Sequence, residues 1–282
     1  MSRVALVTGT SSGIGLYTAV ALAKAGFTTI ATMRNTGKAG ALQTEAAAAG
    51  VTLDVRALEV QDAASIQACV DGIIRDHGRI DLLVNNAGSG YLGTMEETPF
   101  EDLQQVMDVN FYGVWRVTQA VFPHMRKAGS GRIITNTSIG GLIGQPFNDA
   151  YCAAKFAVEG FMESLAPVAK RLGIHVSIVE PGPVKTEFVA TVREKLSQAS
   201  SRPTADGAYE AMREAYLSGS AQVFAVGQTG ADVAAVFLKA ATDEVPHLRY
   251  VTSDMVRALA SRKYVDLDGD SIIAMTGSRL GQ

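Results

Sequence analysis

Short apolar runs alternate with longer segments of helical period along the first two-thirds of the chain. RVALVT at 3–8 and IDLLV at 80–84 are typical of these runs, which are rich in β-branched residues. Strands that alternate with helices at this spacing predict right-handed crossovers and a parallel sheet covered on both faces. The sequence therefore predicts an α/β fold with a doubly wound parallel sheet.

The expected elements follow one another at regular intervals. Strands are expected at 3–8, 27–33, 51–58, 80–84, 131–137 and 174–180. Helices are expected near 13–25, 38–49, 62–77, 99–127 and 149–172. A further helix near 229–241 and a strand near 248–251 are expected to close the sheet.

No linker rich in Pro, Gly or Ser divides the chain, so we expect residues 1–282 to form a single domain. Over 183–228 the alternation loosens into a long excursion past a strand end, where open α/β sheets place their substrate-binding parts. Residues 252–282 are expected to form a C-terminal tail.

Composition limits the kinds of molecule that the protein is expected to bind. Hydrophobic residues make up 47% and charged residues 19%, and the net charge is −3 without a basic stripe, which argues against a nucleic-acid partner. No apolar run approaches the length of about 18 residues that spans a membrane, and we expect a cytoplasmic protein. Cys69 and Cys152 are too few for a disulfide framework and lack companions for a metal site, so no metal is expected.

Residues 8–15 read TGTSSGIG, directly after the first strand and at the start of the first helix. Gly9 permits a tight turn, Gly13 lets a pyrophosphate approach the backbone, and Gly15 lets the helix lie close to the sheet. The free N–H groups of the helix N-terminus attract phosphates. This turn predicts a dinucleotide site.

The end of the second strand indicates which dinucleotide is bound. An acidic residue there would bind the 2′-hydroxyl of NAD, but the strand ends IATMRN and presents Arg34, which suits a 2′-phosphate. We therefore expect NADP in preference to NAD.

Residues 151–155 read YCAAK, which puts Tyr151 and Lys155 on one face of a helix. Further polar groups follow other strands: NNAG at 85–88, Asn110, Ser138 and PG at 181–182. Together TGxxxGxG, NNAG, the Asn-Ser-Tyr-Lys tetrad and PG-x-V-x-T resemble the short-chain dehydrogenase/reductase family over nearly the whole chain. The resemblance implies a Rossmann-type fold and an NADP-dependent alcohol dehydrogenase or carbonyl reductase.

Family resemblance assigns the catalytic roles to the tetrad. Tyr151 is the acid/base, and Lys155 with the oxidised nicotinamide is expected to lower its ordinary pKa of about 10. Ser138 would bind the substrate oxygen, Lys155 the nicotinamide ribose, and Asn110 a water that relays protons. Thr186 and the Val184 backbone would bind the carboxamide.

The same resemblance implies a longer set of cofactor contacts. They are Gly9, Ser11, Ser12, Gly13, Ile14, Gly15, Arg34, Glu59, Val60, Asn86, Ala87, Gly88, Tyr151, Lys155, Pro181, Gly182, Val184 and Thr186. Glu59 stands in LEVQD where the family commonly has an aspartate that contacts adenine, so contact through Glu59 and through the Val60 backbone are both open.

Residues 140–166, the IATMR stretch and residues 236–255 resemble the 17β-hydroxysteroid and retinol dehydrogenase branch. That branch implies a largely apolar alcohol, ketone or aldehyde substrate, with Ser138, Phe147, Tyr151 and Phe188 as substrate contacts. Further candidates for the pocket are Val192, Tyr216 and Phe224.

Two departures argue against naming a steroid. Estrogen-acting members have a histidine where this chain has Gly219, and a glutamate where it has Ser278. Two other functions stay open: a β-ketoacyl thioester reductase, and a non-catalytic NADP(H)-binding regulator. By resemblance, we expect a homodimer or homotetramer that pairs through helices 99–127 and 149–172.

Overall fold

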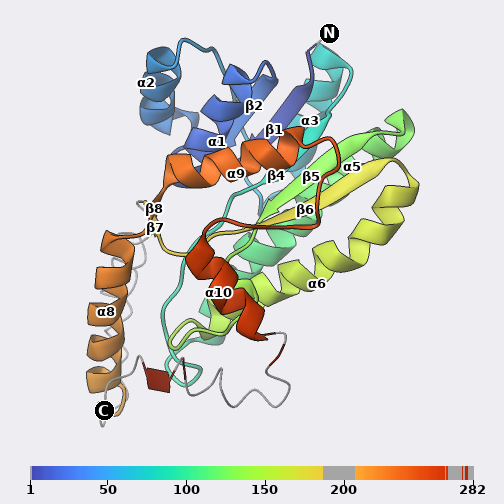
Figure 1. Cartoon of the computed structure of the whole chain (residues 1–282). Helices are drawn as coiled ribbons and strands as arrows, with labels where there is room; N and C mark the ends of the chain where they lie inside the picture. The colour runs from blue at the N-terminus through green and yellow to red at the C-terminus, as the bar shows by residue number, and fades with distance from the viewer. Residues whose placement is uncertain (1, 187–206, 264, 266–274, 276, 279–282) are drawn as a thin grey trace.

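The computed structural model describes residues 2–186, 207–263, 265, 275 and 277–278, and these form a seven-stranded central sheet (Figure 1). Its order is β3-β2-β1-β4-β5-β6-β9, and all neighbouring strands are parallel. The strands are β1 (Val4–Thr8), β2 (Thr28–Met33), β3 (Asp54–Ala57), β4 (Leu82–Asn85), β5 (Gly131–Asn136), β6 (Ile174–Glu180) and β9 (Arg249–Val251). The predicted doubly wound α/β fold is confirmed.

Both faces of the sheet are covered by helices, which explains why the strands are apolar along their length. In β1, Val4 and Leu6 belong to one core, while Ala5 and Val7 belong to the other. The first core packs against α3 (Ala63–His77), α5 (Gly113–Ala128) and α6 (Asp149–Arg171). The second packs against α1 (Gly13–Lys24), α2 (Gly40–Ala48) and α9 (Gly230–Thr242), and α1 and α9 lie side by side in Figure 1.

The helix expected over 99–127 is divided into three parts. After α4 (Phe100–Met107) comes a π-helical segment, η2 (Asp108–Tyr112), and then α5. The side-chain amide of Asn110 donates to the carbonyl of Val106 at 3.0 Å, and such a bond competes with the regular helical ladder. Apolar periodicity continues through the segment and gives no sign of the change.

Several elements lie in segments where the sequence does not clearly alternate between strand and helix patterns. A short parallel pair joins β7 (Val184–Lys185) to β8 (Gln228–Thr229). Helix α8 (Glu210–Ala225) extends away from the sheet in Figure 1, and α10 (Asp254–Lys263) follows β9. None of the described helices is both long enough and apolar enough to cross a membrane.

The strand order reverses between β1 and β4. From β1 the chain winds outward through β2 to β3, and then returns to the other side of β1 as β4. Connections leave the sheet in opposite directions at such a point, which opens a crevice at the carboxyl ends of the strands. The motifs identified in the sequence follow β1, β4, β5 and β6 at this edge.

Candidate active site

The glycine-rich turn after β1 packs directly against the segment after β4. Gly9 has a φ of +71°, and a Cβ on it would lie 2.7 Å from the Cα of Ala87. A Cβ on Gly15 would lie 2.2 Å from Nδ2 of Asn86 and 2.3 Å from the carbonyl oxygen of Gly9. Close approach therefore requires glycine at both positions.

Thr8 ties the two segments together, and the sequence reading missed it. Its hydroxyl accepts hydrogen bonds from the backbone N–H groups of Asn86 at 2.9 Å and Ala87 at 3.0 Å. The Asn86 amide in turn donates to the carbonyls of Thr8 and Gly9, both at 3.0 Å. The position of Thr8, between a buried strand and a glycine turn, was the available signal.

The N-terminus of α1 is open to an anion. Ser12 is the N-cap residue, and its side chain makes no capping hydrogen bond. A cavity of about 670 Å³ adjoins this turn. Its lining comprises Ser12, Gly13, Leu16, Tyr17, Ala41, Lys185, Thr186, Ala221, Phe224 and Ala225. Backbone that only glycine permits, next to uncapped N–H groups and a cavity, fits a cofactor bound through its phosphates.

Arg34 and Glu59 lie together beyond the ends of β2 and β3. The Arg34 side chain is 75% exposed, and its Nε is 3.6 Å from Oε2 of Glu59. Glu59 also accepts from the N–H of Gln61 at 3.3 Å. Val60 is buried against Gly113, and its carbonyl accepts from Arg116 at 3.4 Å.

Tyr151, Ser138 and Lys155 are brought together after β5 and on α6. The Nζ of Lys155 is 5.7 Å from the centre of the Tyr151 ring and donates to the carbonyl of Asn136 at 3.0 Å. The phenol of Tyr151 is hydrogen-bonded to Ser138. Ser138 also accepts from the N–H of Gly140 at 3.0 Å.

Burial shifts the pKa of both titratable groups in this trio. It raises the pKa of Tyr151 to about 12, against the hydrogen bond from Ser138, which lowers it. It lowers the pKa of Lys155 to about 8, against the charge of Glu159, which raises it. We expected Lys155 and the oxidised nicotinamide to lower the pKa of Tyr151. Among the protein's own groups, burial is the larger influence, so Tyr151 is a protonated phenol at neutral pH.

Asn110 is buried and its side chain is engaged on both sides. Its Oδ1 accepts from the N–H of Ser89 at 3.1 Å, and its Nδ2 donates to the carbonyls of Ser89 and Val106. A Cβ on Gly88 would lie 2.9 Å from this oxygen and 3.8 Å from Nζ of Lys155. Asn110 thus joins η2 to the segment after β4, beside Lys155, and its water relay stays a prediction.

The segment after β6 lies over the glycine turn. The carbonyl of Pro181 accepts from the N–H of Ile139 at 2.8 Å, which ties this segment to that of Ser138. Val184 pairs with Gln228 across β7 and β8. Thr186 lies 3.4 Å from the Cβ that Gly13 would carry. Gly182 instead packs against α10, since a Cβ there would lie 2.8 Å from Val256.

The expected substrate residues fall into two groups. Phe147 is buried, has a φ of +60° that a bulky residue rarely adopts, and lies 5.7 Å from the Tyr216 ring between centroids. Asn148 donates to the Tyr216 hydroxyl at 2.9 Å. Phe224 lines the cavity beside Ser12 instead. Phe188 and Val192 lie outside the described residues.

Helix α8 is attached to the segment after β4 by contacts that the sequence reading did not predict. Arg213 forms an ion pair with Glu97, and the hydroxyl of Tyr209 donates to Glu96 at 2.7 Å. Residues separated by more than a hundred positions make these bonds, so no local pattern indicates them. The exposed Gly219 lies farther along α8, and Ser278 donates to the carbonyl of Met275 at 2.8 Å.

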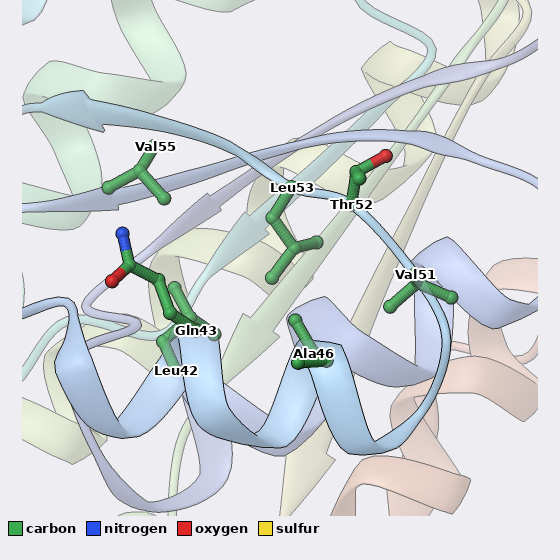
Figure 2. Close-up of a pocket in the computed structure, with 8 residues that line it drawn as sticks. Leu42, Gln43, Ala46, Val51, Thr52, Leu53 and Val55 are labelled. Carbon is green, nitrogen blue, oxygen red and sulfur yellow. The ribbon is translucent and has the colours of Figure 1, made fainter.

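A smaller hollow of about 230 Å³ lies between α2 and the segment leading into β3 (Figure 2). Its lining is apolar apart from Gln43 and Thr52, and it includes none of the expected site residues. Among the described residues, no group of three or more His, Cys, Asp and Glu side chains could hold a metal ion.

Comparison with known proteins places the chain in a family. The family profile described as short chain dehydrogenase matches residues 3–197. The chain belongs to the short-chain dehydrogenase family. The resemblance in the sequence motifs is thereby confirmed, and the chain is an oxidoreductase that transfers hydride with a nicotinamide cofactor.

Relatives of this short-chain dehydrogenase confirm the expected branch. Retinol dehydrogenase 8 of Bos taurus is 41% identical over 272 residues, which cover 95% of this chain and 86% of the relative. The human 17-beta-hydroxysteroid dehydrogenase type 1 is 39% identical over 277 residues, covering 96% and 83%. A solved single-residue variant of actinorhodin polyketide ketoreductase with NADPH is 32% identical, has a TM-score of 0.74, and covers 89% of this chain and 95% of its own.

Proposed function

We propose that this short-chain dehydrogenase transfers hydride between NADP(H) and the carbinol or carbonyl carbon of a largely apolar alcohol, ketone or aldehyde. The single observation that supports this best is the contact of Tyr151 with Ser138, close to Lys155. It lies at the strand edge that carries the glycine turn. A partly buried phenol and hydroxyl beside a buried ammonium suit proton transfer to a carbonyl oxygen at that edge.

The protein's groups act on the substrate oxygen. The nicotinamide, when bound, supplies or accepts the hydride. Tyr151 gives its phenolic proton to the carbonyl oxygen as negative charge develops there, and a protonated phenol at neutral pH suits this direction. Ser138 donates a second hydrogen bond to the same oxygen. Lys155 keeps a positive charge beside the phenol, which stabilises the phenolate left after transfer.

The remaining residues would hold the cofactor. Gly9, Gly13 and Gly15 allow the phosphates to approach the backbone, with Ser11, Ser12 and Ile14 at the start of α1. Asn86, Ala87 and Gly88 would line the crevice, and the adenine would meet either Glu59 or the Val60 backbone. Lys155 would bind the nicotinamide ribose, while Thr186 and the Val184 backbone would hold the carboxamide. Pro181 and Gly182 are further expected cofactor contacts.

Arg34 supports NADP over NAD. Its guanidinium is exposed after β2, and the nearest acidic group, Glu59, is too distant for a close hydrogen-bonded ion pair at 3.6 Å. A guanidinium in this place can turn to a 2′-phosphate and form two parallel hydrogen bonds with it. The same position offers no carboxylate for the 2′-hydroxyl of NAD.

An apolar substrate is supported by the relatives and by the residues around the excursion. Retinol and hydroxysteroids, in the names of the two relatives, are large apolar alcohols. The buried ring of Phe147 packs against that of Tyr216, and residues 183–228 would enclose the substrate. Gly219 has no side chain to bind a distant hydroxyl, so we name no steroid.

Replacing Phe188 by Ser is expected to raise KM for bulky carbonyls more than for small ones.

Two alternatives remain open. The similarity to a polyketide ketoreductase favours a β-ketoacyl thioester as a second candidate substrate. A non-catalytic NADP(H)-binding regulator would have no need for Ser138, Tyr151 and Lys155 together.

We also expect a homodimer or homotetramer, since Tyr112, Trp115 and Phe156 leave aromatic surface exposed on η2, α5 and α6. The expected location is the cytoplasm.

The test is oxidation of NADPH, with NADH in parallel, by the pure protein against a panel of carbonyl compounds. The panel spans short aliphatic, aromatic, acyl-thioester, retinoid and steroid members. Turnover with NADPH that increases with apolar bulk supports the proposal, whereas a sharp preference for the thioesters favours the second candidate. Tight NADPH binding without turnover of any member favours the regulator.

A further inference from the structure

Four charged groups are gathered around the face of α6 that carries Lys155, and all but Arg249 are buried. Glu159 follows Lys155 by one helical turn and is 5% exposed, and Glu180 at the end of β6 is 1% exposed. Arg249 of β9 binds both carboxylates: its guanidinium donates to Oε2 of Glu159 and, at 2.6 Å, to Oε1 of Glu180. Buried charges persist only when opposite charges lie nearby.

When all four groups are ionised, the cluster holds two positive and two negative charges. Lys155 and Arg249 contribute the positive charges, and Glu159 and Glu180 the negative ones. Lys155 donates to a backbone carbonyl, that of Asn136, which is a neutral acceptor. Glu159 is the acidic residue whose field reaches Lys155 and opposes the effect of burial on it. The lysine therefore depends on a carboxylate that reaches it through space.

We propose that Glu159 is a positioning residue of the reaction. Its carboxylate, held in place by Arg249, supplies the negative charge that keeps Lys155 an ammonium in its buried location. The inference rests on the proposed function, because it concerns the lysine of that site. It extends the site to β9, a strand whose residues do not line the cavity beside the glycine turn.

An anchor between α6 and β9 would not need this carboxylate. Glu163, one turn farther along α6, already binds Arg249 at 2.8 Å and is 63% exposed on its side chain. The second oxygen of Glu159, Oε1, is buried and takes no part in the bond with Arg249, which goes to Oε2. A hydrogen bond with Thr137, which follows β5, also favours the ionised carboxylate. A Cβ on Gly141 would lie 3.3 Å from Oε1, so glycine leaves room for the carboxylate near Ser138.

The groups that face Glu159 decide the pH at which it acts. They are Lys155 and Glu163 on α6, Glu180 on β6 and Arg249 on β9. Burial raises the pKa of Glu159 to about 7 and the charge of Glu180 adds to this, whereas the hydrogen bond with Thr137 and the charge and hydrogen bond of Arg249 oppose it. Lys155, with a pKa of about 8, titrates just above. The two groups should therefore titrate as a coupled pair near neutral pH.

The direct test is a pH titration of Lys155 in the cofactor-free protein, followed by NMR with ¹³C-labelled lysine. The Lys155 resonance is assigned by its loss in Lys155→Met. In Glu159→Gln the midpoint is expected to fall by about one pH unit or more, the effect of removing a nearby opposite charge. Glu163→Gln is the matched control, with the same change on the same helix and the same arginine, and should leave the midpoint in place. An unchanged midpoint in Glu159→Gln would overturn the inference.

Two further measurements separate charge from shape. Glu159→Asp keeps the charge and should keep most of the wild-type midpoint, whereas a fall equal to that of Glu159→Gln counts against an electrostatic role. Should Glu159→Gln fail to fold, the wild-type titration alone decides. The Lys155 resonance should then show an inflection at the pH where the Glu159 carboxyl carbon titrates, and a simple single step would overturn the inference.

Kinetics distinguishes the failure of this inference from that of the proposed function. Tyr151 and Lys155 must both be protonated for carbonyl reduction, so the alkaline limb of kcat should move to lower pH by about one unit in Glu159→Gln and stay in place in Glu163→Gln. A wild type inactive on every carbonyl, but with the lysine midpoint shifted as expected, would contradict only the proposed reaction. Full activity with an unshifted limb would contradict only the role of Glu159.

Discussion

At Tyr151 two influences act in opposite directions. Burial raises the pKa of the phenol to about 12, and the hydrogen bond with Ser138 lowers it. The phenol therefore carries its proton over the whole neutral range and can act as an acid without prior activation. The reverse reaction requires a phenolate, so it depends more strongly on the positive charge of Lys155 nearby.

Replacement of Tyr151 by Phe keeps the ring and removes only the transferable proton. We expect kcat for carbonyl reduction to fall by about 10²- to 10⁴-fold, the usual contribution of a positioned acid. Binding of NADPH, measured by fluorescence titration, should be retained, because the proposed phosphate site lies at the start of α1. Activity close to the wild-type rate would remove Tyr151 from the chemistry.

At Arg34 the expected change concerns only the cofactor. Arg34→Ala removes the proposed partner of a 2′-phosphate, and a lost charge-assisted hydrogen bond is worth about 1.5–3 kcal/mol. We expect KM for NADPH to rise about tenfold or more, while KM for NADH stays unchanged. Arg126→Ala, at the exposed end of α5, is the control. Equal increases for both cofactors would argue against recognition of the phosphate by Arg34.

Among the elements, α1 shows how close packing fixes the glycine turn. Gly15 lies in the first turn of α1, against Asn86 and the carbonyl of Gly9. Gly160 lies in the middle of α6 with nothing within 4 Å of its potential Cβ. The two positions are both helical, so they differ in packing rather than in backbone conformation.

Alanine substitution should have opposite effects at these two positions. Gly15→Ala must displace Asn86 or the turn itself, and we expect it to lower the free energy of unfolding by about 1–3 kcal/mol and to weaken NADPH binding. Gly160→Ala removes backbone freedom from the unfolded chain and should add up to about 1 kcal/mol. Urea denaturation measures both. A destabilised Gly160→Ala would show that α6 is constrained there by a contact outside the single chain.

Local periodicity predicted most elements to within a few residues, because buried parallel strands are continuously apolar and amphipathic helices repeat. It failed where a single side chain changes the backbone, as Asn110 does in η2. It also failed where distant residues meet. Arg213 and Glu97, or Arg249 and Glu159, leave no mark in a window of helical length.

The residues of the site were easier to predict from the sequence than the contacts around them. Motif spacing assigned Ser138, Tyr151 and Lys155 to one edge, and the structure brings those three together. Thr8 was missed because its role is to accept two N–H groups from another strand. Glu159 was missed although it follows Lys155 by four residues, since only its burial shows that it is not a solvated surface charge.

For the whole molecule, burial of the Lys155 ammonium lowers the free energy of unfolding. The pKa of Lys155 falls from an ordinary 10.5 to about 8, a difference of about 2.5 units. Each unit corresponds to about 1.4 kcal/mol. The folded state therefore binds the proton less tightly than the unfolded state, and the ammonium destabilises the fold at every pH below about 8. This penalty declines between about 8 and 10.5 and is absent above.

Lys155→Met should accordingly be more stable than the wild type and inactive. We expect a gain of about 2 kcal/mol at pH 7, after subtracting about 1 kcal/mol for the lost hydrogen bond to Asn136. Glu159 can take up a proton in the variant, since its pKa is already about 7. Urea denaturation at pH 7 and pH 10 measures the effect, which should shrink at the higher pH. A gain that is equal at both values would contradict the assigned pKa.

Strand β9 completes the sheet from the far end of the chain, since it pairs with β6 about seventy residues after β6 ends. During synthesis the glycine turn, Ser138, Tyr151 and Lys155 are therefore made long before Arg249 is added. A nascent chain that has not reached Arg249 would carry the proposed catalytic groups and still lack the cation that holds Glu159. By the inference above, Lys155 in such a chain would lose its proton at a lower pH, so the alkaline limit of activity depends on a residue that is synthesised late.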